Sequence, residues 1–163
     1  MKVQDLLNEL KETERYKKFK SQNPESFFAA AFFILDTEQK TETIQLDFFL
    51  PSKNKVAAFE HPFAEAKIHD DEIKPMQPQS TEIKIDIDDL ESTSKKIIKE
   101  NESAIVPAKI IAILRDDQWN LTCMDNALGI VRIKLDAKSG EQADFNKGSL
   151  MDFMGIRKNK NHN

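Results

Sequence analysis

The residues best suited to hold a metal ion lie in one proline-rich stretch near the middle of the chain. His61 and His69 are followed by three consecutive acidic residues, Asp70, Asp71 and Glu72. Imidazole nitrogens and carboxylate oxygens are ligands for zinc and similar cations. No helical or strand spacing fixes these residues relative to one another, so we expect solvated loop charge instead of a metal centre. A metal-dependent hydrolase is the alternative function that this cluster would support.

A second acidic group, Asp86, Asp88 and Asp89, has the residue types of a paired-carboxylate acid–base site. The group comes directly before a helical pattern, where exposed backbone N–H groups and the helix dipole favour carboxylates. Glu91 follows Asp88 by three residues, which is the spacing of a capping box. We therefore expect this group to cap a helix.

The motifs of common enzyme classes do not occur in the sequence. It has no G-x-S-x-G elbow, no H-E-x-x-H and no glycine-rich phosphate loop. Cys123 is the single cysteine, so no intramolecular disulfide can form, and it alternates with Leu121 and Trp119 as a buried strand residue would. We predict a chain that is not an enzyme and has no catalytic residues, no cofactor and no metal.

Two basic segments interleaved with apolar residues could contact a nucleic acid. They are YKKFK at residues 16–20 and IRKNKNH at residues 156–162. Lysine and arginine neutralise phosphates, and aromatic rings stack on bases. The net charge of -4, from 24 basic and 28 acidic residues, opposes this function. A nucleic-acid-binding accessory protein is therefore an alternative reading, and we expect these segments to be a helix surface and a chain end.

The helices are predicted from apolar residues at helical spacing. Residues 2–12 should form an amphipathic helix, and a second, shorter helix should end before Pro24. A third should run from about residue 89 to Asn101. The stripes that define the first and third helices are Val3, Leu6, Leu7 and Leu10, and Leu90, Ser94, Ile97 and Ile98.

Alternating or continuous apolar runs predict strands in both halves of the chain. The runs are FFAAAFFILD, TIQLDFFLP and VAAFE in the first half, and EIKIDI, KIIAILRD, WNLTCMD and IVRIKLD in the second. Residues 61–80 carry three prolines and no period, so they are predicted to be a surface connector. The NALG turn should have positive φ angles at Asn126 and Gly129. No apolar run approaches the roughly 20 residues of a membrane-spanning helix.

The last predicted strand ends in D-A-K-S-G-E, residues 136–141. Asp136 can accept backbone hydrogen bonds and Gly140 can adopt a left-handed conformation, so the motif is predicted to turn the chain. Residues 88–141, a helix and three strands that end in this motif, resemble a PepSY repeat, and the first half resembles it more faintly, with PSKNK at 51–55 as the counterpart turn. The resemblance implies a helix packed on an antiparallel sheet in a non-catalytic binding or inhibitory module, of a kind usually found outside the cytoplasm.

Together these patterns predict one α+β domain over residues 1–150, followed by a short extension and basic tail at 151–163. Within it we expect half one at 1–60, a connector at 61–80 and half two at 81–145, both PepSY-like or cystatin-like. The expected sheet has about five to seven antiparallel strands with two principal helices on one face. Its other face, near Phe49, is either open to a partner or covered by the connector or tail. We expect a cytoplasmic protein that binds a protein or peptide, a second copy included, and that does not enter a membrane.

Overall fold

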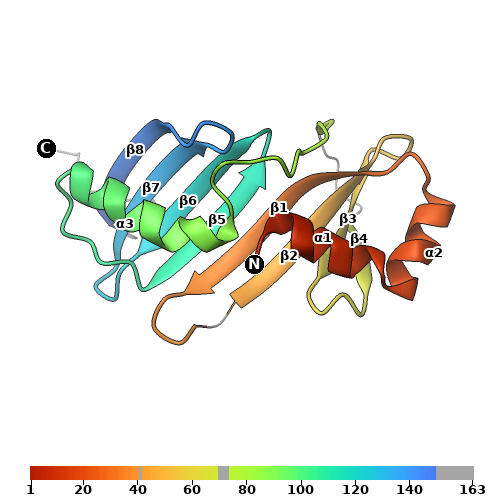
Figure 1. Cartoon of the computed structure of the whole chain (residues 1–163), viewed down its shortest axis with the longest axis horizontal. Coiled ribbons are helices and arrows are strands. Elements are labelled where there is room, and N and C mark those ends of the chain that lie inside the picture. Colours follow the sequence, from red (N-terminus) through yellow and green to blue (C-terminus); the bar gives the residue numbers. More distant parts are fainter. Residues whose placement is uncertain (41, 70–73, 150–163) are drawn as a thin grey trace, which may run out of the picture.

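The computed structural model describes residues 1–40, 42–69 and 74–149. Eight strands form one antiparallel sheet, and three helices are packed on it (Figure 1). The helices are α1 (Val3–Lys11), α2 (Glu14–Gln22) and α3 (Leu90–Glu100), the last preceded by a 3-10 turn, Ile87–Asp89. The strands are β1 (Phe27–Asp36), β2 (Glu42–Leu50), β3 (Lys55–Glu60), β4 (Ala66–His69), β5 (Lys109–Arg115), β6 (Gln118–Met124), β7 (Gly129–Asp136) and β8 (Gln142–Ser149).

The two halves of the chain contribute equal numbers of strands to the sheet. It is β4-β3-β2-β1-β5-β6-β7-β8, so each half of the chain contributes four consecutive strands. The first strands of the two halves, β1 and β5, pair antiparallel at the centre. One continuous sheet therefore runs through both halves, with a seam between β1 and β5.

The prediction of an α+β fold with two principal helices and five to seven strands is wrong. The fold is mostly sheet, with eight strands and three short helices of 9, 9 and 11 residues in the described part. Strand β8 was missed because QADFNKGS lies at an edge and is largely exposed, so it has no apolar alternation. Strand β4 was missed because it lies inside the proline-rich stretch.

The segment EIKIDI, predicted to be a strand, is not one. Its isoleucines alternate because the segment crosses the apolar side of the sheet, where Ile83 and Ile85 pack against the core. The backbone N–H groups of Lys84 and Ile85 both donate to the carbonyl of Ala137, at 2.8 and 3.1 Å. The alternating isoleucines therefore reflect contact with the core, although the segment is not a strand.

The main core lies between the helices and one face of the sheet. Figure 1 shows α1 and α3 crossing the same face, one over each half. The predicted stripe of α1 is fully confirmed, because Val3, Leu6, Leu7 and Leu10 are all buried. The stripe of α3 is confirmed as well, and Trp119 lies beneath it with no exposed surface and donates its ring N–H to the carbonyl of Ile85 at 2.8 Å. In the described ranges, no helix has the length and apolar character needed to span a membrane.

The cap of the helical segment in the second half is Asp86, two residues earlier than the predicted cap Asp88. Asp86 Oδ1 accepts the N–H of Ile87 at 2.8 Å, and Asp89 Oδ2 accepts the N–H of Asp86 at 2.9 Å. The capping box is therefore Asp86 with Asp89, not Asp88 with Glu91. The expectation that these carboxylates cap a helix is confirmed for Asp86 and Asp89.

The D-A-K-S-G-E motif turns the chain as predicted. Asp136 Oδ1 accepts the N–H groups of Lys138 and Ser139 at 2.9 and 2.8 Å, and Gly140 has a φ of 80°. These backbone donors, that of Ser139 foremost, lower the pKa of Asp136. The turn accounts for the polar residues of the motif.

The first half contains the same turn, but not at PSKNK. Asp36 Oδ1 accepts the N–H groups of Glu38 and Gln39 at 3.0 and 2.8 Å, and Lys40 has a φ of 59°. This turn joins β1 to β2, whereas PSKNK joins β2 to β3. The predicted correspondence of PSKNK with DAKSG is therefore wrong. The turn of the first half that has the conformation of DAKSG is the preceding one, at residues 36–40.

The NALG prediction also placed the left-handed residue wrongly. Leu128, with a φ of 64°, takes that conformation in the β6–β7 turn, and neither Asn126 nor Gly129 does. Gly129 is required for space, because a Cβ there would lie 2.7 Å from Asp125 Oδ2. Asp125 Oδ1 accepts the Gly129 N–H at 2.6 Å, which fixes this close approach.

Candidate functional site

The sheet face opposite the helices carries an apolar block at the seam between the halves. In the β1–β5 register, Phe32 lies opposite Ile113 and Ile34 lies opposite Ile111. Successive residues of a strand point to opposite faces, and the adjacent Ala31 and Phe33 are buried in the core on the helix side. We call these four residues, Phe32, Ile34, Ile111 and Ile113, the seam patch. Ile113 is 38% exposed and the other three are half-buried.

Uncharged polar side chains border the seam patch on both sides. On β2, Thr43 lies opposite Ile34 and Gln45 lies opposite Phe32. On β6, Thr122 lies opposite Ile111 and Asn120 lies opposite Ile113. A small apolar centre within a hydrogen-bonding border has the composition of a protein-binding surface.

Charged residues occupy the two ends of the seam on this face. At one end Asp36 lies opposite Lys109, and at the other Arg115 lies opposite Ala30, which is itself opposite Asp47. Burial raises the pKa of Asp47, while the hydrogen bond from Gln45 Nε2, at 2.9 Å, and the charges of His69 and Arg115 oppose that rise. Asp47 is thus a partly desolvated carboxylate next to the seam patch.

The connector covers a neighbouring part of the same face. Met76 is 8% exposed and packs with Phe49, which is 4% exposed, and with Ala30 and Val56. Gln79 fixes the connector in place: its N–H donates to the carbonyl of Phe28, and its amide group exchanges two hydrogen bonds with Asp117, at 2.9 and 2.8 Å. Of the two alternatives stated for Phe49, the structure shows the covered one, while the seam patch keeps exposed surface.

The fold has a solved counterpart. It is the crystal structure of a putative lipoprotein from Clostridium difficile 630, with a TM-score of 0.51 and 12% sequence identity over 82% of this chain and 90% of that chain. At this identity the likeness shows the fold alone. No protein-family model matches the chain, and no curated protein matches it.

The candidate metal ligands are only partly brought together. His61 and His69 both line a surface groove of about 360 Å³ beside β3 and β4, and His61 Nε2 contacts Glu9 Oε2 at 2.8 Å. Asp70, Asp71 and Glu72 lie outside the described residues. Within residues 1–40, 42–69 and 74–149, no group of three His, Cys, Asp or Glu residues could hold a metal ion.

Cys123 is buried in the core, as its alternation predicted. It has no exposed surface, and burial raises the pKa of its thiol to about 11 although a hydrogen bond with Ser94 opposes the rise. The group is therefore a neutral thiol near pH 7, while nucleophilic cysteines are thiolates. Cys123 belongs to the packing of β6.

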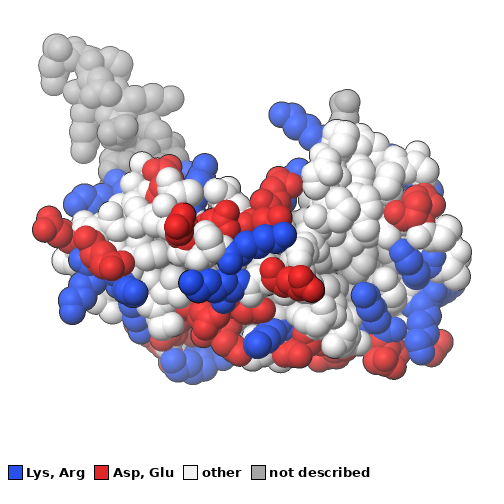
Figure 2. Space-filling model, turned by 45° about the horizontal axis from the view of Figure 1, so that its top comes forward, with Lys and Arg blue, Asp and Glu red and all other residues white. Residues whose placement is uncertain are grey.

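The described basic segment lacks free aromatic rings. Tyr16 and Phe19 of α2 are 8% and 7% exposed, and both rings contact Phe48 and Phe59 in the core. They are not available for stacking on bases. The other segment, residues 156–162, lies outside the described residues. On the face in Figure 2, basic and acidic side chains are interspersed and form no continuous basic surface.

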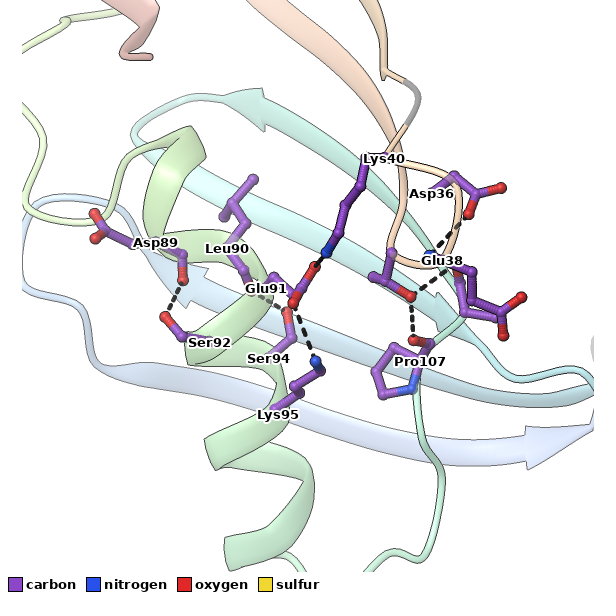
Figure 3. Close-up of polar contacts among 12 residues, drawn as sticks. Asp36, Glu38, Lys40, Asp89, Leu90, Glu91, Ser92, Ser94, Lys95 and Pro107 are labelled. Atoms are coloured by element: carbon purple, nitrogen blue, oxygen red, sulfur yellow. Dashed lines mark hydrogen bonds and ion pairs between the residues drawn. The ribbon is translucent and has the colours of Figure 1, made fainter.

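A polar cluster on the helix side ties the first hairpin to α3 (Figure 3). Lys40, in the β1–β2 turn, reaches Glu91 at 4.0 Å, and Glu91 also pairs with Lys95 at 3.0 Å. Thr37 Oγ1 donates to the carbonyl of Pro107 at 2.7 Å, just before β5. These contacts join the two halves beside the seam, and exposed ion pairs of this kind contribute little free energy.

The sequence alone did not locate the seam patch. Its signal was present in FFAAAFFILD and KIIAILRD, which are apolar at consecutive positions and therefore on both faces of the sheet. The register between β1 and β5 was needed to show that the outward residues of these two strands meet.

Proposed function

We propose that this chain is a non-enzymatic module that binds a protein or peptide partner through the seam patch. The observation that carries the proposal is the exposure of Ile113, opposite Phe32 and beside Ile111, on a sheet face that the helices do not cover. Burial of such apolar side chains against a partner supplies favourable free energy, roughly 25 cal/mol per Å² of apolar area.

The surroundings of the patch support the same proposal. In the described part of the connector, Met76 packs on Phe49 on this face and Gln79 donates to Asp117 in the β5–β6 turn, while Ile113 on the seam remains 38% exposed. Apolar centres with polar rims are typical of interfaces in which a few central residues dominate the binding energy. Ile113 is the most exposed residue of the seam patch.

The location and the family relationship remain expectations within this proposal. A single, buried cysteine is compatible with a reducing cytoplasm, which supports a cytoplasmic location. The solved counterpart is named a putative lipoprotein, and a location at a membrane surface is the alternative that this name supports. Fractionation of host cells with an antibody against the chain separates the two. The PepSY-like character stays a prediction.

The proposal is tested by affinity capture with three immobilised baits. The wild-type chain is compared with Ile113→Asp, which places a charge in the seam patch, and with Val106→Asp, which changes a side chain that is 72% exposed in the loop before β5. We expect the wild-type and Val106→Asp baits to capture the same host protein, and the Ile113→Asp bait to recover about tenfold less, because a central hot-spot residue contributes at least 1 to 2 kcal/mol.

Chemical cross-linking locates the bound protein on the chain. Lys109 lies two residues before Ile111 on the same strand face and should form cross-links to the captured protein. Equal capture by the Ile113→Asp bait, cross-links confined to the helix side, or recovery of nucleic acid without protein would each contradict the proposal. Thermal unfolding of the three baits confirms that they are equally folded.

A further inference from the structure

Strand β8 forms a long edge of the sheet. It spans eight residues, Gln142–Ser149, and within the described residues it pairs with β7 alone. The opposite edge, β4, has four residues. An edge strand presents a row of backbone N–H and C=O groups that match another extended strand. Edge β8 is therefore the longer surface for strand addition.

The backbone of β8 shows which groups face outward. The N–H of Phe145 donates to Asp144 Oδ1 at 2.8 Å, so it is not committed to its β7 neighbour Ile133. In an antiparallel pair, residues alternate between hydrogen-bonded and non-hydrogen-bonded positions. Phe145 and Lys147 thus direct their backbone groups away from β7, while Asn146 faces it.

Asp144 occupies the outward donor of its own strand. Its second oxygen, Oδ2, accepts a hydrogen bond from Asn146 Nδ2 at 3.1 Å, which holds the carboxylate in place beside the edge. Charged side chains placed at sheet edges are a common means of preventing association with another strand. A carboxylate that also satisfies the outward N–H removes the group with which a new strand would first pair.

We propose that β8 is an edge at which a second copy of this chain can pair, and that the Asp144 carboxylate blocks this pairing. When Asp144 releases the Phe145 N–H, two β8 strands pair antiparallel about Phe145, and each Phe145 exchanges both backbone hydrogen bonds with the other. The same register sets Asp144 opposite Asn146 of the second copy, so the amide that holds the carboxylate within one chain is replaced by its counterpart. This edge is separate from the seam patch.

The proposal is tested by sedimentation velocity over a range of concentrations. Asp144→Ala frees the Phe145 N–H, and we expect it to tighten dimerisation by about tenfold or more relative to the wild type, as loss of a competing charged hydrogen bond implies. Adding Lys147→Pro removes an outward N–H without touching the β7 ladder and should return the variant to a monomer. Lys147→Ala, which keeps that N–H, is the matched control and should remain dimeric.

Two further measurements distinguish pairing through β8 from association through another surface of the chain. Hydrogen exchange of the Phe145 and Lys147 amides in Asp144→Ala should slow as the concentration rises, which does not depend on the proline variant. Adding Ile113→Asp should leave the dimer intact, so a failure of the seam-patch proposal does not affect this result. Equal association of wild type and Asp144→Ala, a dimer that survives Lys147→Pro, or a dimer abolished by Ile113→Asp would overturn the proposal.

Discussion

The backbone N–H of Val3 donates to Asp86 Oδ1 at 2.9 Å, across 83 positions of the chain. The same oxygen accepts the N–H of Ile87 at 2.8 Å, so one buried carboxylate accepts from the first residue of α1 and from the first residue of the 3-10 turn that leads into α3. Figure 1 shows these helix starts meeting over the seam. Because helix N-termini carry unpaired donors and a positive partial charge, Asp86 stabilises both helices and holds them together.

Replacement of Asp86 should therefore cost more than the loss of an ordinary cap. We expect Asp86→Ala to lower the free energy of unfolding by about 3 kcal/mol, since a cap contributes about 1 and a buried donor left unpaired costs about 1 to 3 more. Urea unfolding followed by circular dichroism measures the change. Glu82→Ala is the control at an exposed acidic residue four positions earlier and should stay within about 0.5 kcal/mol of wild type. Equal effects of the two substitutions would show that Asp86 does not link the helices.

The turn residues Gly140 and Lys40 give a matched pair of opposite predictions. Gly140 has a φ of 80° and an added Cβ would lie 3.3 Å from Ile85 Cδ1, so Gly140→Ala should lower the unfolding free energy by about 1 to 2 kcal/mol. Lys40 has a φ of 59° in the corresponding position of the β1–β2 turn, so Lys40→Gly should be neutral or stabilising by up to about 1 kcal/mol. Thermal and urea unfolding measure both. Destabilisation by Lys40→Gly would contradict the equivalence of the two turns.

The thiol of Cys123 should make the fold sensitive to alkaline pH. Its pKa in the folded chain is raised from 9.0 to about 11, so between those values the unfolded chain loses the proton and the folded chain keeps it. Stability is therefore fully present below pH 9 and falls as pH rises toward 11, by up to about 1.4 kcal/mol per pH unit from this group. Comparison of wild type with Cys123→Ala over pH 8 to 11 isolates the contribution. Rapid alkylation of the native thiol at pH 8 would contradict it.

The sequence predicted an element correctly where burial of one face produces a regular spacing of apolar residues. It did not predict elements that lack such a spacing. The stripe from Val3 to Leu10 and the turn at Asp136 and Gly140 were predicted because each follows from local physical rules. Strand β8 was not, because an exposed edge is held by its hydrogen bonds to β7, and those do not select apolar residues. Leu128 was not, because leucine rarely adopts a positive φ and no local sequence rule selects it for that position. The seam patch depended on a pairing between strands about 80 positions apart in the chain.

Asp47 provides the last prediction, which connects stability with the proposed binding face. Its carboxylate is partly buried beside the seam patch, and burial raises its pKa. Between its unfolded and folded pKa values the folded chain binds the proton more strongly, so this group's contribution is present below the unfolded pKa and is lost as pH rises through the folded pKa. Asp47→Asn keeps an oxygen that can accept the hydrogen bond from Gln45 Nε2 and removes the buried charge. We expect the variant to be more stable than wild type at pH 7 and to match it at acid pH.

The comparison with Glu100→Gln controls for a general loss of negative charge, because Glu100 is exposed at the end of α3. Urea unfolding at pH 3.5 and pH 7 gives the difference in unfolding free energy between each variant and the wild type at both pH values. A loss of stability in Asp47→Asn at pH 7 would refute the assignment of a desolvated charge. A carboxylate that destabilises the fold at neutral pH is of the kind that binding surfaces retain. If Asp47→Asn is more stable but captures less of the partner held by the wild-type chain, Asp47 contributes to binding next to the seam patch. If capture is unchanged, Asp47 lies outside the binding surface.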